Sequence, residues 1–246
     1  MKQEMYDSMY RTERYHWWFH GKRELVLALA APYLSALPAP HIIDFGCGCG
    51  AMLEALSPFG TVTGADFSPL ALDYCRKRFP CELRQLDLSL PSVPNARFDF
   101  GVALDVLEHI ENDLTAAKNI FSCLRPGGTC IITVPAYQWL WSAHDENCMH
   151  KRRYDRRTLQ SLLLRSGFEI EFLSYYNALL FPAAAAVRLL SRWLHTDRES
   201  SLENGFRDSP VNRLLFRIFR LEKGVLGRGR TFPFGLSLIA VVRRPE

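Results

Sequence analysis

Short apolar runs alternate with helix-like segments from about residue 40 onward, and this alternation limits the chain to few folds. The runs that predict strands are His41–Phe45, Thr61–Asp66, Cys81–Leu86, Phe98–Leu104, Cys130–Val134, Phe168–Leu173 and Leu236–Val242. Helix signals lie between them, such as Ser68 followed by Pro69, an N-cap with proline at the first helical position. Strands separated by helices form parallel sheets. We therefore expect an α/β fold with a doubly wound, mostly parallel sheet.

The segments outside this alternation predict additions to one main domain. The 246 residues suit one large domain or one domain with an insert. We expect residues 1–35 to form an N-terminal helical cap and residues 36–246 the main domain, with a helical lid or insert at about 177–232. The segment 136–154 is rich in aromatic and charged side chains without a clean period, which predicts a long functional loop.

Composition excludes several classes of protein. With 48% hydrophobic and 23% charged residues, the chain is neither disordered nor fibrous. The longest apolar run, residues 178–187, is shorter than the roughly 20 residues that span a bilayer. An odd count of seven cysteines, with no signal-peptide pattern, predicts reduced thiols and a cytoplasmic location. Because no Cys-x-x-Cys pair occurs, we expect no metal site.

Positive charge is concentrated late in the chain, although the net charge is only +4. Residues 151–157 hold five cations against one acid, and residues 207–246 hold nine against three. Solvated basic faces are the commoner reason for such patches, and no aromatic-basic motif accompanies them, so no nucleic-acid partner is expected. The apolar segment 178–195 predicts a buried lid helix, with peripheral membrane contact as the alternative. The sequence does not specify an oligomeric state.

A glycine-rich turn, Asp-Phe-Gly-Cys-Gly-Cys-Gly at residues 44–50, joins the first strand to the first helix of the sheet. Glycines at such a turn let the backbone approach a ligand, and the helix N-terminus offers free N–H donors. Gly46, Gly48 and Ala51 also match the dinucleotide fingerprint. The turn alone therefore leaves a nicotinamide dehydrogenase open.

Acidic residues at four successive strand ends narrow this choice. Asp44, Asp66, Asp87 and Asp105 are expected at the edge where open α/β sheets bind ligands. Asp66 follows Gly46 by 20 residues, where a carboxylate can accept hydrogen bonds from both ribose hydroxyls. Such an edge repels a diphosphate but suits a ligand with an adenosine and a positive charge, which disfavours a dehydrogenase.

Five motifs between about residues 40 and 135 resemble those of class I S-adenosylmethionine-dependent methyltransferases. They are the glycine turn, Gly-Ala-Asp-Phe-Ser-Pro at 64–69, Asp-Leu at 87–88, Asp-Val-Leu-Glu-His at 105–109 and Leu-Arg-Pro-Gly-Gly at 124–128. The resemblance implies a Rossmann-like sheet of seven strands, the last of them antiparallel. It also implies S-adenosyl-L-methionine as the cofactor, bound at the carboxyl edge of the sheet.

The resemblance further implies which residues hold that cofactor. The residues assigned to it from the motifs are Asp44, Gly46, Gly48 and Gly50 beneath the methionine part, Asp66 at the ribose, Phe67, Asp87 and Leu88 at the adenine, and Asp105 and Val106 on the methionine side. His109 is expected to cap the helix beneath the cofactor. On the N-terminal helix, Trp18 is a candidate neighbour of the sulfonium and Arg23 a candidate partner of the cofactor carboxylate.

Candidates for the chemical step lie in the later segments. His144 beside Asp145 suggests an oriented acid–base pair, although adjacent residues often point apart. His150 and His109 are alternative bases. Tyr137 is a candidate donor to a substrate oxygen, and Tyr176 is a candidate lining residue.

His-Trp-Trp-Phe at 16–19 and Trp-x-x-His-Asp at 141–145 flank these motifs. These two segments resemble uncharacterised bacterial methyltransferases, many of them tied to glycan, lipid or natural-product biosynthesis. The expected acceptor is therefore a small molecule or a lipid, glycan or natural-product intermediate, methylated on an O, N, C or S atom. The alternative is a cyclase or lyase that closes a small ring from the cofactor's amino-acid part and releases methylthioadenosine.

Overall fold

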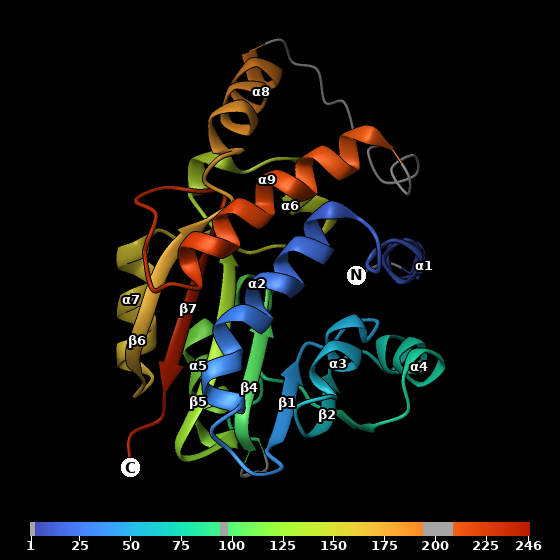
Figure 1. Cartoon of the computed structure of the whole chain (residues 1–246), viewed down its shortest axis with the longest axis vertical. Helices are drawn as coiled ribbons and strands as arrows, with labels where there is room; N and C mark the ends of the chain where they lie inside the picture. Colours follow the sequence, from blue (N-terminus) through green and yellow to red (C-terminus); the bar gives the residue numbers. More distant parts are fainter. Residues whose placement is uncertain (1–2, 94–97, 194–208) are drawn as a thin grey trace.

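The computed structural model describes residues 3–93, 98–193 and 209–246, and a seven-stranded sheet forms its centre (Figure 1). The strands are β1 (His41–Phe45), β2 (Thr61–Asp66), β3 (Glu82–Gln85), β4 (Phe98–Leu104), β5 (Leu124–Pro135), β6 (Glu169–Tyr176) and β7 (Ser237–Arg243). Their order across the sheet is β3-β2-β1-β4-β5-β7-β6. Pairs are parallel except that β7 runs antiparallel to both β5 and β6. This confirms the predicted α/β fold and its antiparallel last strand.

Helices cover both faces of the sheet, as expected for a doubly wound fold. One face carries α2 (Trp17–Leu34), α3 (Ala51–Leu56), α4 (Pro69–Arg78) and α9 (Pro210–Leu226), and the other carries α5 (Asp113–Cys123) and α7 (Arg156–Arg165). Neighbouring residues of β1 show why both faces must be covered. Ile42 packs in the core on the side of α2 and α9, and Ile43 packs in the core on the side of α5 and α7. A strand buried on both faces reads as a continuous apolar run.

Two helices precede the first strand. The first, α1 (Gln3–Thr12), packs on α4 through the rings of Tyr6 and Tyr10 against Tyr74. The second, α2, crosses the sheet beside α9 (Figure 1), and its buried residues include Leu25 and Val26. The segment 1–35 is thus helical in its described part, as predicted, and the buried face of α2 belongs to the main core.

One local prediction was wrong. The segment 136–154, predicted as a long loop, contains a 3-10 turn η2 (Gln138–Leu140) and helix α6 (Ala143–Asn147). The start of α6 is stabilised by a capping box between Ser142 and Asp145.

The first part of β5 is irregular. Gly127 has a φ of +76°, and the register between β4 and β5 shifts between Phe98 and Phe100. Gly127 N–H donates to the Arg244 carbonyl, and Arg244 N–H donates to the Gly128 carbonyl. Pairing with the C-terminal residues therefore extends β5 through these glycines.

The predicted insert at about 177–232 contains α8 (Phe181–Trp193) and α9. Residues 194–208, which include the end of the segment predicted to contact a membrane, lie outside the described residues. Among the described helices, none combines the length and apolar character needed to cross a bilayer.

Gly21→Ala is expected to lower the free energy of unfolding by about 1–3 kcal/mol, because overpacking forces neighbouring groups to move. A Cβ at Gly21 on α2 would lie 2.6 Å from Cγ of Phe219, which is fully buried on α9. Urea denaturation measures the change. Gly224→Ala on α9 is the control, since a Cβ there meets nothing within 4 Å. Equal stability of Gly21→Ala and wild type would contradict this packing.

Candidate active site

The glycine turn and Asp66 meet where β1 and β2 end. Gly48 N–H donates to Oδ2 of Asp66 at 3.0 Å, and Ser68 N–H donates to Oδ1 at 2.9 Å. The Asp66 carboxylate is buried but keeps further lone pairs for other donors. Burial raises the pKa of Asp66, and the backbone hydrogen bonds from Ser68 and Gly48 oppose this rise. The carboxylate is thus fixed at the edge where the sequence predicts the ribose.

The turn itself has no room for side chains. Gly46 and Gly48 have φ values of +68° and +53°, a region that favours glycine. A Cβ at Gly46 would lie 2.6 Å from Cγ2 of Val106, and one at Gly48 would lie 2.8 Å from Cε of Met9 on α1. The backbone of the turn is therefore enclosed by the end of β4 and by α1.

Asp44 lies buried beneath this turn. Burial is the main cause that raises its pKa well above the ordinary value, and the carboxylates of Asp66 and Glu13 add to the rise. Lys22 opposes the rise. Asp44 therefore contributes a polar group below the turn and not an exposed charge.

An ion pair links α2 to the end of β4. Lys22 Nζ lies 2.6 Å from Oδ2 of Asp105, and the Thr133 hydroxyl donates to Oδ1 at 2.8 Å. Burial raises the pKa of Asp105, but Lys22 and Thr133 outweigh it and hold the pKa below its usual value. Asp105 also has a φ of +58°, so its backbone adopts a conformation unusual for an aspartate. The pair places one ionised carboxylate at the centre of the sheet edge.

Arg23, the cation that the sequence suggested for this region, has other partners. Its guanidinium donates to the backbone carbonyls of Glu13 at 3.0 Å and Arg14 at 3.3 Å. These bonds fix the segment between α1 and α2. The neighbouring residue Lys22, which sequence reasoning missed, is the one that contacts a predicted cofactor residue.

Two of the three residues predicted at the adenine lie at the surface beside β3. Phe67 is 60% exposed, and Asp87 is exposed as well. The Asp87 carboxylate accepts hydrogen bonds from the Ser89 N–H at 2.8 Å and the Ser89 hydroxyl at 2.6 Å. Leu88 is buried in the core. A contact of Phe67 and Asp87 with adenine stays a prediction.

Aromatic side chains form two separate groups. Trp18 stacks on the fully buried Tyr176 with ring centres 5.9 Å apart. Burial raises the pKa of Tyr176 well above its ordinary value, with Asp105 as a further cause, so its hydroxyl keeps its proton. Tyr137 belongs to the second group, in which it stacks on Tyr175 at 5.2 Å and contacts Phe181 on α8.

The predicted pair of His144 and Asp145 does not form, which corrects the sequence interpretation. Asp145 is fully buried and accepts from Nδ1 of His150 at 2.8 Å and from Nε and Nη2 of Arg153 at 2.7 and 2.9 Å. The exposed His144 instead places Nε2 3.6 Å from Sγ of Cys148. Consecutive residues of a helix point in different directions, so the side chains of His144 and Asp145 point apart.

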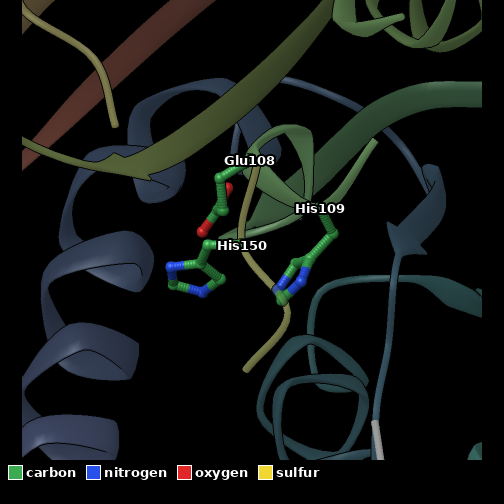
Figure 2. Close-up of side chains that lie close together, drawn as sticks. All are labelled: Glu108, His109 and His150. Carbon is green, nitrogen blue, oxygen red and sulfur yellow. The ribbon is translucent and has the colours of Figure 1, made fainter. Parts of the chain in front are cut away.

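His150 brings Asp145 into a larger cluster. Its ring lies 4.7 Å from that of His109, which belongs to the 3-10 turn η1 (Leu107–His109) after β4. Figure 2 shows these two rings with the Glu108 side chain beside them. Burial, and then the neighbouring His150, lower the pKa of His109 to about 4. Burial, and then Asp105, raise the pKa of Glu108 well above its ordinary value.

Comparison with known proteins identifies the family of this chain. Residues 14–172, more than half of the chain, match the model of a family described as a methyltransferase domain. The chain belongs to the class I S-adenosylmethionine-dependent methyltransferases. Membership of this family confirms two predictions: the protein is a methyltransferase, and its cofactor is S-adenosylmethionine.

Relatives of the methyltransferase span different shares of the chain. A protein of Mycolicibacterium smegmatis named as an S-adenosylmethionine-dependent methyltransferase is 28% identical over 179 residues, which cover 71% of this chain and 68% of the relative. A ubiquinone biosynthesis O-methyltransferase of Coxiella burnetii is 32% identical over 100 residues, 37% of this chain and 42% of the relative. The crystal structure of an S-adenosylmethionine-dependent methyltransferase from Mesorhizobium loti is 19% identical, with a TM-score of 0.56 over 89% of this chain and 100% of that one.

The edge of the sheet fits the family's cofactor. The methyltransferase presents a glycine cradle that a Cβ would fill, and a carboxylate anchored by Gly48 and Ser68 next to it. Asp105 adds a second carboxylate, with Lys22 as its partner. These carboxylates suit S-adenosylmethionine. Its ribose hydroxyls can donate hydrogen bonds to Asp66, and its methionine end is cationic, as a neighbour of Asp105 would be.

Proposed function

We propose that this methyltransferase transfers the methyl group of S-adenosylmethionine to a hydroxyl oxygen of a small molecule or of a lipid, glycan or natural-product intermediate. The observation that supports oxygen as the acceptor is the cluster of Glu108, His109 and His150. Glu108 lies three residues after Asp105, at the same edge of the sheet. A hydroxyl must lose its proton to become a strong nucleophile, and such a cluster contains groups that can assist this loss. The relatives named O-methyltransferases agree with this choice.

The cofactor supplies a sulfonium methyl that an acceptor oxygen attacks in line. Asp66 would bind the ribose and so orient the adenosine side, and the glycine turn would lie beneath the methionine part. The Asp105 carboxylate, held by Lys22, would attract the cationic methionine end. The ring of Trp18, which is half-buried and stacks on Tyr176, offers an aromatic face of the kind that a sulfonium favours. Transfer of this methyl group to a hydroxyl would leave S-adenosylhomocysteine, and the hydroxyl proton would pass to solvent water.

Product analysis tests this proposal directly. The enzyme is incubated with S-adenosylmethionine carrying a deuterated methyl group, with and without a bacterial small-molecule extract, and the products are separated by mass spectrometry. We expect S-adenosylhomocysteine together with a labelled product, and its NMR spectrum should show the methyl group on oxygen. Methylthioadenosine as the only nucleoside product would instead support the ring-closing cyclase or lyase. A label on nitrogen, carbon or sulfur would overturn the choice of a hydroxyl acceptor.

A further inference from the structure

Three side chains that offer metal-binding atoms meet beside the cofactor edge. Glu108 and His109 belong to η1, and His150 follows α6 (Figure 2). One ligand atom from each of the three lies within 4.8 Å of the others. The backbone holds the two segments together, because Lys151 N–H donates to the Glu108 carbonyl at 2.7 Å.

Glu108 lacks a partner for its carboxylate within the part of the chain that the structure describes. The residue is fully buried, and neither carboxylate oxygen has a hydrogen-bond partner there. Neighbouring cations are engaged elsewhere, Lys22 by Asp105 and Arg153 by Asp145. A buried carboxylate without a partner is costly, so native structures normally pair such groups or use them as metal ligands.

His150 is oriented as a metal-ligating histidine would be. Its Nδ1–H donates to Asp145, which leaves the Nε2 lone pair free to bind a cation. Asp145 cannot easily turn away, because Arg153 binds both of its oxygens and Ser142 N–H donates to Oδ2 at 2.8 Å. Histidines that bind metals commonly donate their second ring nitrogen to a carboxylate in this way.

We propose that Glu108, His109 and His150 bind one divalent transition-metal ion, with Zn²⁺ bound more tightly than Mn²⁺. Two imidazoles and one carboxylate are a ligand set that suits such ions and leaves coordination positions open. The cysteines of the chain take no part in this site. The expectation of no metal site rested on cysteine spacing, and the ligands proposed here come from segments that are about 40 residues apart.

The role of this metal rests on the proposed function. An acceptor hydroxyl that occupies an open position on the ion becomes more acidic, since a bound cation stabilises the oxyanion. Its proton passes to solvent water, and the oxygen then forms the bond to the methyl carbon while the carbon–sulfur bond breaks. An acceptor with a second oxygen next to the hydroxyl could bind the ion through both atoms.

The test measures metal binding without cofactor or acceptor. The full chain is stripped of metal with a chelator, transferred to chelator-free buffer and titrated with Co²⁺, whose visible absorption reports its coordination, and then with Zn²⁺ in competition. Wild type should bind one equivalent. Glu108→Gln should bind more than about 100-fold more weakly, since even changes behind the ligands typically cost roughly 10- to 100-fold. Glu111→Gln, three residues along and 84% exposed in its side chain, should bind as wild type does.

Thermal unfolding of the same samples separates a lost ligand from a damaged fold. Metal-free Glu108→Gln should melt no lower than metal-free wild type, because glutamine has nearly the same size and replaces a buried carboxyl that has no hydrogen-bond partner with a neutral amide. Zn²⁺ should raise the melting temperature of wild type and Glu111→Gln only. No saturable Co²⁺ or Zn²⁺ binding by wild type, or equal binding by Glu108→Gln, would overturn the site. Because these measurements omit S-adenosylmethionine, either result leaves the test of methyl transfer unaffected.

Discussion

Asp66→Ala should weaken the binding of S-adenosylmethionine by at least about 100-fold. The carboxylate is fixed by hydrogen bonds from Gly48 N–H at 3.0 Å and Ser68 N–H at 2.9 Å. From this position the Asp66 carboxylate is expected to accept hydrogen bonds from both ribose hydroxyls. Each hydrogen bond to a charged group contributes about 1.5–3 kcal/mol, so the loss of two predicts this change in the dissociation constant. Isothermal titration calorimetry measures it.

A matched control distinguishes this role from a general effect of removing an acid. Asp73 on α4 is an exposed aspartate paired with Arg76, and Asp73→Ala should bind the cofactor as wild type does. Circular dichroism of both variants should match that of wild type. A dissociation constant of Asp66→Ala within a few-fold of the wild-type value, in a folded protein, would contradict the assignment of Asp66 to the cofactor.

Arg153→Met should lower the free energy of unfolding by about 3–5 kcal/mol, because it leaves Asp145 buried without its main counter-charge. The pair is bidentate, with distances of 2.7 and 2.9 Å, and both side chains are buried. Denaturant titration in the presence of a chelator measures the change without any contribution from bound metal. Arg156→Met on the exposed face of α7 is the control and should change stability little.

The loss caused by Arg153→Met should depend on pH. Although burial raises the pKa of Asp145, hydrogen bonds from His150 and Arg153 hold that pKa below its ordinary value. Stability from such a group is present above the unfolded pKa of about 3.9 and is lost as the pH falls. The difference between Arg153→Met and wild type should therefore be largest near neutral pH and shrink below about pH 4. A loss that stays constant into acid would show that packing, and not charge, accounts for the effect.

The sequence predicted the sheet because its central strands are buried on both faces. Ile42 and Ile43 enter opposite cores, so the strand appears as a continuous apolar run. The cofactor edge was predictable for a similar reason, since the glycine turn and Asp66 follow consecutive strands and their spacing is local. The limits of β5 and β6 were less predictable, because pairing with β7 and with the residues that follow it determines them.

The interactions that sequence reasoning missed depend on how the chain folds. Lys22 and Asp105 are 83 residues apart, and only the crossing of α2 over the sheet brings them together. His150 and Asp145 lie close in sequence, yet a turn of helix lets them meet while the adjacent pair of His144 and Asp145 separates. No local pattern distinguishes these arrangements before the fold exists.

The position of β7 also determines when the sheet can be completed. Because β7 lies between β5 and β6, those two strands cannot pair with each other, and each keeps an open edge until residues 237–243 arrive. On a ribosome these residues emerge after α8 and α9, so the nascent chain carries an open edge on β5 and an unpaired β6 while residues 177–236 are synthesised. Chains truncated before β7 should therefore aggregate, although every predicted cofactor residue is already present.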